Sequence, residues 1–167
     1  MITVREATTA DASTLVAYLK ELVAEPGICI PLAPDEIPTL DQERAILDDV
    51  SRSETAIMLI AQAEGQLVGE LSLRSISPRR AVRHVGTLGM SVRTSWRRKG
   101  VGRELLAAAL EWAPTAGIKR VELYVYARNS GAIALYENSG FTIEGRRTGF
   151  IREGDTYLDD LVMARQL

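Results

Sequence analysis

Apolar residues near the start of the chain repeat with the spacing of an amphipathic helix. After a short β-prone run at residues 2–7, apolar side chains recur every three or four positions up to about Ala24, which places them on one face of a helix. Thr8 stands before this run with Asp11 three residues later, the spacing of a capping box. The pattern predicts a strand followed by a helix that packs one face on a core.

A second capping-box pattern, Thr39 with Gln42, predicts another helix through Val50. The segment between the two helices, residues 26–38, holds four of the six prolines and is predicted to be irregular. A loop placed there is suited to shape the mouth of a pocket. It contains Cys29, the single cysteine, which we expect to be a small buried hydrophobic residue because structural cysteines outnumber reactive ones.

The middle of the chain is rich in β-prone residues. Residues 55–76 form two apolar runs joined by a short turn at Glu64 and Gly65, which predicts a hairpin of two central strands. Residues 81–92 predict a third strand of the same sheet. A Leu-rich run from Glu104 to about Trp112 predicts a helix.

The last third of the chain predicts a strand at residues 119–127, a short helix with Asn129 as its N-cap and Gly140 as its stop, and a final hairpin turning at residues 153–155. The order of elements predicts an α/β domain with a mixed sheet. Its strand, crossover helix and parallel strand span residues 84–126.

Composition fits one domain over residues 1–167, with 46% hydrophobic and 25% charged residues and a net charge of -2. This charge gives no bulk attraction to nucleic acid or anionic lipid. No apolar run approaches the roughly 20 residues of a membrane-spanning helix, and no signal-peptide pattern opens the chain, so we expect a cytoplasmic protein. One cysteine and one histidine cannot assemble an ordinary zinc site, and no metal is expected.

The stretch SWRRKGVGRELL, residues 95–106, places three cations and two glycines directly before a predicted helix. A helix start leaves backbone N–H groups without partners and carries partial positive charge, so it attracts anions. Glycine reaches positive φ freely and lets successive N–H groups curve around an oxyanion. Two interpretations follow from these residues, a phosphate cradle at the carboxyl end of a strand or a solvated basic turn.

Two common nucleotide motifs do not match this stretch. The Lys-Ser/Thr pair of a P-loop is absent, and Leu105 stands where a dinucleotide fingerprint requires its third glycine. The pattern Arg97-x-x-Gly100-x-Gly102 after an apolar strand instead resembles the acetyl-CoA pyrophosphate motif of the GNAT superfamily of N-acetyltransferases.

A second segment carries the same resemblance. The spacing Asn-x-x-Ala-x-x-Leu-Tyr-x-x-x-Gly-Phe of that superfamily is matched by Asn129, Ala132, Leu135, Tyr136, Gly140 and Phe141. Two motifs in the right order, with the order of strands, extend the resemblance over nearly the whole chain. It implies the GNAT-like fold, a central, mostly antiparallel sheet of about six or seven strands with about four helices.

The resemblance also implies how acetyl-CoA, the cosubstrate, is held. Its pyrophosphate is expected on the N–H groups of the cradle, and its pantetheine beside the main chain of a splayed strand. Asn129 is expected to bond to the pantetheine, to cap its helix, or both. The cofactor-binding residues are then Met90, Ser91, Val92, Arg97, Arg98, Lys99, Gly100, Val101, Gly102, Asn129 and Tyr136.

In this family an amine attacks the thioester directly, so the leaving thiolate needs a proton. Tyr136 is the matching residue, because a phenol with a pKa of about 10 stays protonated at neutral pH; the alternative is that its ring only packs on the core. The base that takes the proton of the amine stays open among Glu70, His84 and Glu122, which are expected on strands. His84 has the most useful pKa, although a lone strand histidine is more often structural.

The expected function is acetyl transfer to a primary amine of a small molecule, such as an amino acid or a related metabolite. The alternatives are acetylation of protein N-termini or lysines, and a non-catalytic module that binds acetyl-CoA. RNA binding through residues 79–84 is disfavoured because the chain is 5% aromatic and lacks an RNP-like motif. A homodimer is possible, as in many members of the resembled family.

Overall fold

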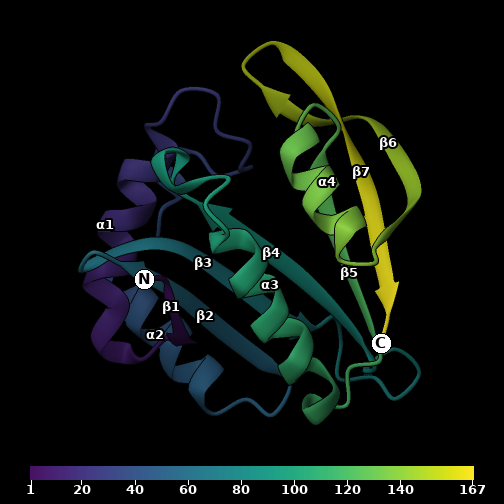
Figure 1. The fold of residues 1–167 in the computed structure, drawn as a ribbon, viewed down its shortest axis with the longest axis horizontal. Helices are drawn as coiled ribbons and strands as arrows, with labels where there is room; N and C mark the ends of the chain where they lie inside the picture. Colours follow the sequence, from purple (N-terminus) through teal and green to yellow (C-terminus); the bar gives the residue numbers. More distant parts are fainter.

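The computed structural model describes residues 1–167 and contains one seven-stranded sheet in the order β1-β2-β3-β4-β5-β7-β6 (Figure 1). All neighbouring strands are antiparallel except β4 and β5. The strands are β1 (Thr3–Glu6), β2 (Ala56–Ala63), β3 (Gln66–Ser75), β4 (Val85–Val92), β5 (Arg120–Tyr126), β6 (Thr142–Glu153) and β7 (Thr156–Gln166).

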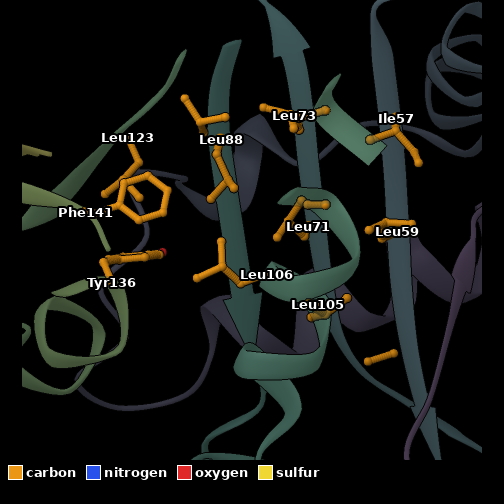
Figure 2. Close-up of a cluster of buried hydrophobic side chains, with 14 of the residues drawn as sticks. Ile57, Leu59, Leu71, Leu73, Leu88, Leu105, Leu106, Leu123, Tyr136 and Phe141 are labelled. Atoms are coloured by element: carbon orange, nitrogen blue, oxygen red, sulfur yellow. The ribbon is translucent and has the colours of Figure 1, made fainter. Parts of the chain in front are cut away.

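Four α-helices cover the sheet: α1 (Ala12–Val23), α2 (Leu40–Ser51), α3 (Val101–Trp112) and α4 (Ser130–Asn138). Figure 1 shows α3 and α4 on one face of the sheet. There Leu71, Leu88, Leu105 and Leu123 belong to the larger core, whose side chains fill the space between α3, α4 and the strands (Figure 2). On the other face, α1 and α2 pack a smaller core around Tyr18. The mixed α/β sheet with seven strands and four helices confirms the predicted fold class.

Local signals placed several elements correctly. The first hairpin turns at Glu64 and Gly65, which both have positive φ, as the tight turn requires. The capping box at Thr8 is formed, with the Thr8 N–H donating to Asp11 Oδ2 over 2.8 Å. The last hairpin turns after Glu153 as predicted.

The third predicted strand begins later than expected. Residues 81–84 form turns, in which the N–H groups of Val82 and Arg83 donate to the Arg79 carbonyl. These local bonds take the place of ladder bonds, so β4 starts only at Val85. The helix predicted from Glu104 begins three residues earlier, at Val101.

The parallel pairing of β4 with β5 is short. It joins residues 85–88 to residues 120–123, whereas β4 runs on to Val92 and β5 to Tyr126. Beyond Leu88 the two strands therefore have no ladder between them, and β5, β7 and β6 diverge from β4 (Figure 1). This β4–β5 gap opens at the carboxyl ends of both strands.

No helix has both the length and the apolar character needed to cross a membrane. The structure brings no three His, Cys, Asp or Glu side chains together in a group suited to a metal ion.

Candidate active site

The turn before α3 forms a concave arrangement of backbone N–H groups. Arg98 and Gly100 have positive φ, 60° and 92°, and Gly100 is the N-cap of α3. The backbone N–H groups of residues 98–103 donate to no acceptor in the protein; the first N–H of the helix that does is that of Glu104. Six free donors and the positive end of a helix make this cradle suited to an anion such as a pyrophosphate.

Gly102 lies where α3 packs closely against β4 and α4. A Cβ at Gly102 would lie 3.0 Å from Leu135 Cδ2 and 3.5 Å from Met90 Cε, so a side chain there would fill the space where β4, α3 and α4 converge. Gly102 therefore lets α3 approach Leu135 and Met90 closely at the wall of the cavity.

Not every cation of the motif faces the cradle. Arg97, Arg98 and Arg103 line the adjoining cavity, whereas the Lys99 ammonium lies 4.8 Å from the centre of the Trp96 ring. Val101 is buried in the core and offers only its backbone. The Lys99 side chain therefore makes a cation–π contact with Trp96 beside the cradle, while its backbone N–H remains one of the six free donors of the cradle.

A cavity of ≈ 570 Å³ connects the cradle to the β4–β5 gap, a size usual for ligand sites. Met90, Ser91 and Val92 line it together with Asn129 and Tyr136. The sequence predicted each of these five residues at the cofactor, and the structure brings them together. The unpaired edge of β4 leaves main-chain groups free to bond to an extended ligand.

The proline-rich loop closes one side of this cavity, where Ile28, Cys29 and Ile30 line it. Cys29 is half-buried, and its Sγ lies 3.7 Å from the Gly27 carbonyl oxygen. The expectation that Cys29 is a small buried hydrophobic residue is wrong, because the side chain is only half-buried in a loop that lines the cavity.

Tyr136 combines core packing with access to the cavity. It is 6% exposed, and its ring centre lies 5.8 Å from that of Phe141. Its hydroxyl oxygen points away from α4 toward the strand that carries Leu88 (Figure 2). Burial raises the pKa of Tyr136 to about 12, so the phenol stays protonated at neutral pH and is able to donate a hydrogen bond into the cavity.

Asn129 caps α4, since its Oδ1 accepts from the Ala132 N–H over 3.2 Å. Its side chain also lines the cavity. The amide nitrogen is not used by this cap and remains available to a ligand.

A chain of hydrogen bonds lies at the edge of the gap, on the α1/α2 face. The Ser91 hydroxyl donates to Glu70 Oε1 over 3.1 Å, and the Tyr18 hydroxyl lies 2.9 Å from Ser91 Oγ. Since serine has one proton to donate, the Tyr18 hydroxyl is the donor to Ser91. The chain therefore runs from Tyr18 through Ser91 to the Glu70 carboxylate.

The Glu70 carboxyl has the properties of a base. Burial is the main cause that raises its pKa above the usual value, the nearby carboxyl of Glu43 raises it further, and the Ser91 hydrogen bond opposes both. Neither Glu70 nor Glu43 has an ion-pair partner. A carboxyl whose pKa is shifted toward neutrality accepts a proton more readily.

The other two candidates for the base lie elsewhere. His84 is an exposed turn residue before β4, seven residues from Ser91, which is roughly 23 Å along a strand. Glu122 lies on β5, where its side chain accepts from the Tyr124 hydroxyl over 3.2 Å and pairs with Arg120. The prediction that His84 lies on a strand at the cleft is wrong. Of the three candidates, only Glu70 bonds to a residue that lines the cavity, Ser91.

The sequence did not single out Tyr18 and Glu43 as functional residues. Both lie at positions where the helical period predicts an apolar side chain facing the sheet, and both are buried. The signal that could have identified them is a polar group on the apolar face of a helix, because burial of such a group costs free energy unless it is hydrogen-bonded.

Comparison with known proteins agrees with this geometry. The model of the Acetyltransferase (GNAT) family matches residues 12–141. The L-amino acid N-acetyltransferase AaaT of Escherichia coli strain K12 is 33% identical over 109 residues, which cover 64% of this chain and 66% of that protein, slightly under two thirds of its length.

Solved structures resemble the whole chain. The acetyltransferase of GNAT family from Streptococcus pneumoniae superposes with a TM-score of 0.93 at 30% identity and 100% coverage of both chains. A GNAT superfamily phosphinothricin acetyltransferase from Sinorhizobium meliloti, in complex with acetyl-CoA, superposes with a TM-score of 0.86 at 20% identity, covering 99% of this chain and 88% of that one.

Proposed function

Since this chain belongs to the GNAT family of acetyltransferases, we propose that it transfers acetyl from acetyl-CoA to the primary amine of a small molecule, an amino acid or a related metabolite. The 33% identity to an L-amino acid N-acetyltransferase supports this acceptor class. The proposal includes one acetyltransferase domain over residues 1–167, a cytoplasmic location and a possible homodimer.

The cosubstrate fits the geometry of the cavity. The N–H groups of residues 98–103 receive the pyrophosphate, and Arg97, Arg98 and Arg103 add positive charge around it. The free edge of β4 at Met90–Val92 receives the pantetheine, which brings the thioester beside Ser91 and Tyr136. No step requires a metal.

The reaction is a direct attack of the neutral amine on the thioester carbonyl carbon. The new C–N bond forms as the C–S bond breaks. The amine proton passes to Ser91 Oγ while the Ser91 proton passes to Glu70 Oε1, along the hydrogen bond already present. The Tyr136 hydroxyl donates to the departing sulfur, and Tyr18 holds Ser91 in orientation.

The observation that carries this proposal is the Tyr18–Ser91–Glu70 chain at the edge of a cavity that also contains Tyr136. The test is release of CoA thiol with a panel of amino acids. Glu70→Gln is expected to lower kcat by about 100-fold or more, in the usual range for a general base. Glu122→Gln is the matched control, a strand carboxylate outside the chain of bonds, and is expected to retain the wild-type rate.

Equal rates for wild type and Glu70→Gln would remove Glu70 from the mechanism. Tyr136→Phe tests the acid in the same assay, and thiol release as fast as in wild type would remove that role. Binding of acetyl-CoA without thiol release for any amine, peptide or protein would favour the non-catalytic alternative. Activity confined to peptides or proteins would favour acetylation of N-termini or lysines.

A further inference from the structure

One row of side chains crosses the sheet on the α1/α2 face and spans the β4–β5 gap. Glu70 pairs with Ser91 across β3 and β4. The parallel register of Leu88 with Leu123, continued by three residues, brings Ser91 level with Tyr126. Because strand side chains alternate between faces, these residues share the face opposite to Leu88 and Leu123.

The row continues beyond the gap. Tyr126 pairs with Asp160 across β5 and β7, and Asp160 pairs with Arg147 across β7 and β6. The row therefore has the candidate base on one side of the gap and a guanidinium on the other. No helix covers this face of β5, β7 and β6 (Figure 1).

Three residues hold the Arg147 guanidinium: Asp160, Tyr124 and Phe150. Its Nε donates to Asp160 Oδ1 over 2.8 Å, and its Nη2 donates to Asp160 Oδ2. The centre of the Tyr124 ring lies 4.1 Å from Cζ and the centre of the Phe150 ring 3.5 Å. Because Tyr124 belongs to β5, the guanidinium reaches from β6 over to the strand that borders the gap.

One edge of the guanidinium remains open. Arginine has five N–H donors, and Asp160 occupies only the Nε–Nη2 edge. Nη1 donates to nothing in the protein, and the Arg147 side chain is 30% exposed while that of Asp160 is 3% exposed. Asp160 and the two rings hold the guanidinium so that its Nη1–Nη2 edge is presented as a fork, the arrangement that recognises a carboxylate.

We propose that Arg147 binds the carboxylate of the acceptor, so that the acceptor is an α-amino acid. This inference rests on the proposed function and names the substrate class of the same site. The α-amine and the carboxylate of an amino acid are attached to one carbon, so a carboxylate held on the Arg147 side of the gap places the amine toward Ser91 and Glu70. The exposed rings of Tyr124 and Phe150 offer an apolar surface to its side chain.

The experiment compares each amino acid with its decarboxylated amine and with its amide, by CoA thiol release. Wild type is expected to prefer the amino acid in kcat/KM by about 10- to 150-fold, the equivalent of one charge-assisted hydrogen bond. Arg147→Gln is expected to lose this preference by slowing acetylation of the amino acid, while acetylation of the amine changes by less than about threefold. Arg147→Lys is expected to lose most of it, because an ammonium beside Asp160 presents no fork.

Arg146→Gln is the matched control. Arg146 is the neighbour of Arg147 on β6, and it pairs with Asp159 over 2.7 Å on the other face. The Arg146→Gln variant loses an ion pair between β6 and β7, so its melting temperature measures the structural effect of such a loss. Its preference for the amino acid over the amine is expected to equal that of wild type.

Two outcomes would overturn the role of Arg147 and leave the proposed function standing. One is that wild type acetylates the amines as well as the amino acids. The other is that Arg147→Gln slows both substrates equally, which indicates a structural role only. A wild-type protein that acetylates neither substrate would contradict the proposed small-molecule function itself, and the role of Arg147 with it.

Discussion

The φ of Gly100 provides a direct test of the phosphate cradle, through the substitution Gly100→Val. At φ 92° a β-branched residue is strained, and the cost is at least about 1 to 2 kcal/mol. Space does not add much to it, because the nearest atom to an added Cβ is the flexible end of Arg103, Nη2, at 3.7 Å. The strain is therefore relieved by rotating the backbone, which turns the N–H groups of the cradle away from the ligand.

Gly117→Val is the matched control. Gly117 has φ 73° with nothing within 4 Å of an added Cβ, so it carries the same strain, but it lies between α3 and β5, away from the cavity. Both variants are expected to melt about 2 to 8 °C lower than wild type, from a shift of about 2 to 4 °C for each kcal/mol in a domain of this size.

Only Gly100→Val is expected to bind acetyl-CoA more weakly. Loss of one charge-assisted hydrogen bond to phosphate costs about 1.5 to 3 kcal/mol, or about 10- to 150-fold in Kd by titration calorimetry. At acetyl-CoA 100 times the wild-type Kd, wild type gains about 2.7 kcal/mol of stability, and a variant binding 100-fold more weakly gains about 0.4 kcal/mol. Equal Kd values for Gly100→Val, Gly117→Val and wild type would refute the cradle.

Three further predictions concern pH and packing. As the pH falls, kcat/KM is expected to decrease with a midpoint above pH 4.5, because Glu70 must lose its proton to act as base and its pKa is raised. The pH–rate profiles of wild type and Glu70→Gln test this, and the same acid limb in both proteins would contradict it. The side-chain hydrogen bond from Arg5 is the main cause that lowers the pKa of Asp11 from 3.8 to about 2. About 2 kcal/mol of stability, fully present above pH 3.8, is therefore expected to disappear as the pH falls through 2. Urea unfolding should show that Asp11→Asn loses less stability than wild type over this pH range. Gly102→Leu is expected to weaken acetyl-CoA binding by at least about tenfold, because its side chain meets Leu135 and fills the cavity; calorimetry showing wild-type affinity would contradict the proposed position of the cosubstrate.

The sequence predicted the parts of this fold that local chemistry determines. A two-residue turn at Glu64 and Gly65 and the capping boxes depend on residues within a few positions of one another. The cradle before α3 is of the same kind, because glycine and a helix start suffice to form it. Asn129 and Tyr136 belong to a motif with fixed spacing around α4, and both line the cavity.

What the sequence did not predict depends on contacts between distant residues. Ser91 was expected to act only through its backbone, but its hydroxyl meets Tyr18, 73 positions away, and nothing in either segment indicates the other. His84 continued the apolar alternation of a strand, yet turns that bond to Arg79 end the pattern before β4. The sequence did not single out Arg147, because its contacts with Tyr124 and Phe150 depend on the folded sheet.

The short pairing of β4 with β5 exposes two strand edges inside the molecule. Unpaired N–H and C=O groups along an edge recruit foreign strands and start aggregation, and proteins normally protect their outer edges with charges, bulges or covering loops. Here residues 90–92 and 124–126 lack such a partner across the gap, and in the proposed complex the pantetheine of the cosubstrate covers the edge of β4. If the pantetheine covers this edge as proposed, the protein without acetyl-CoA is expected to aggregate faster than the protein with it.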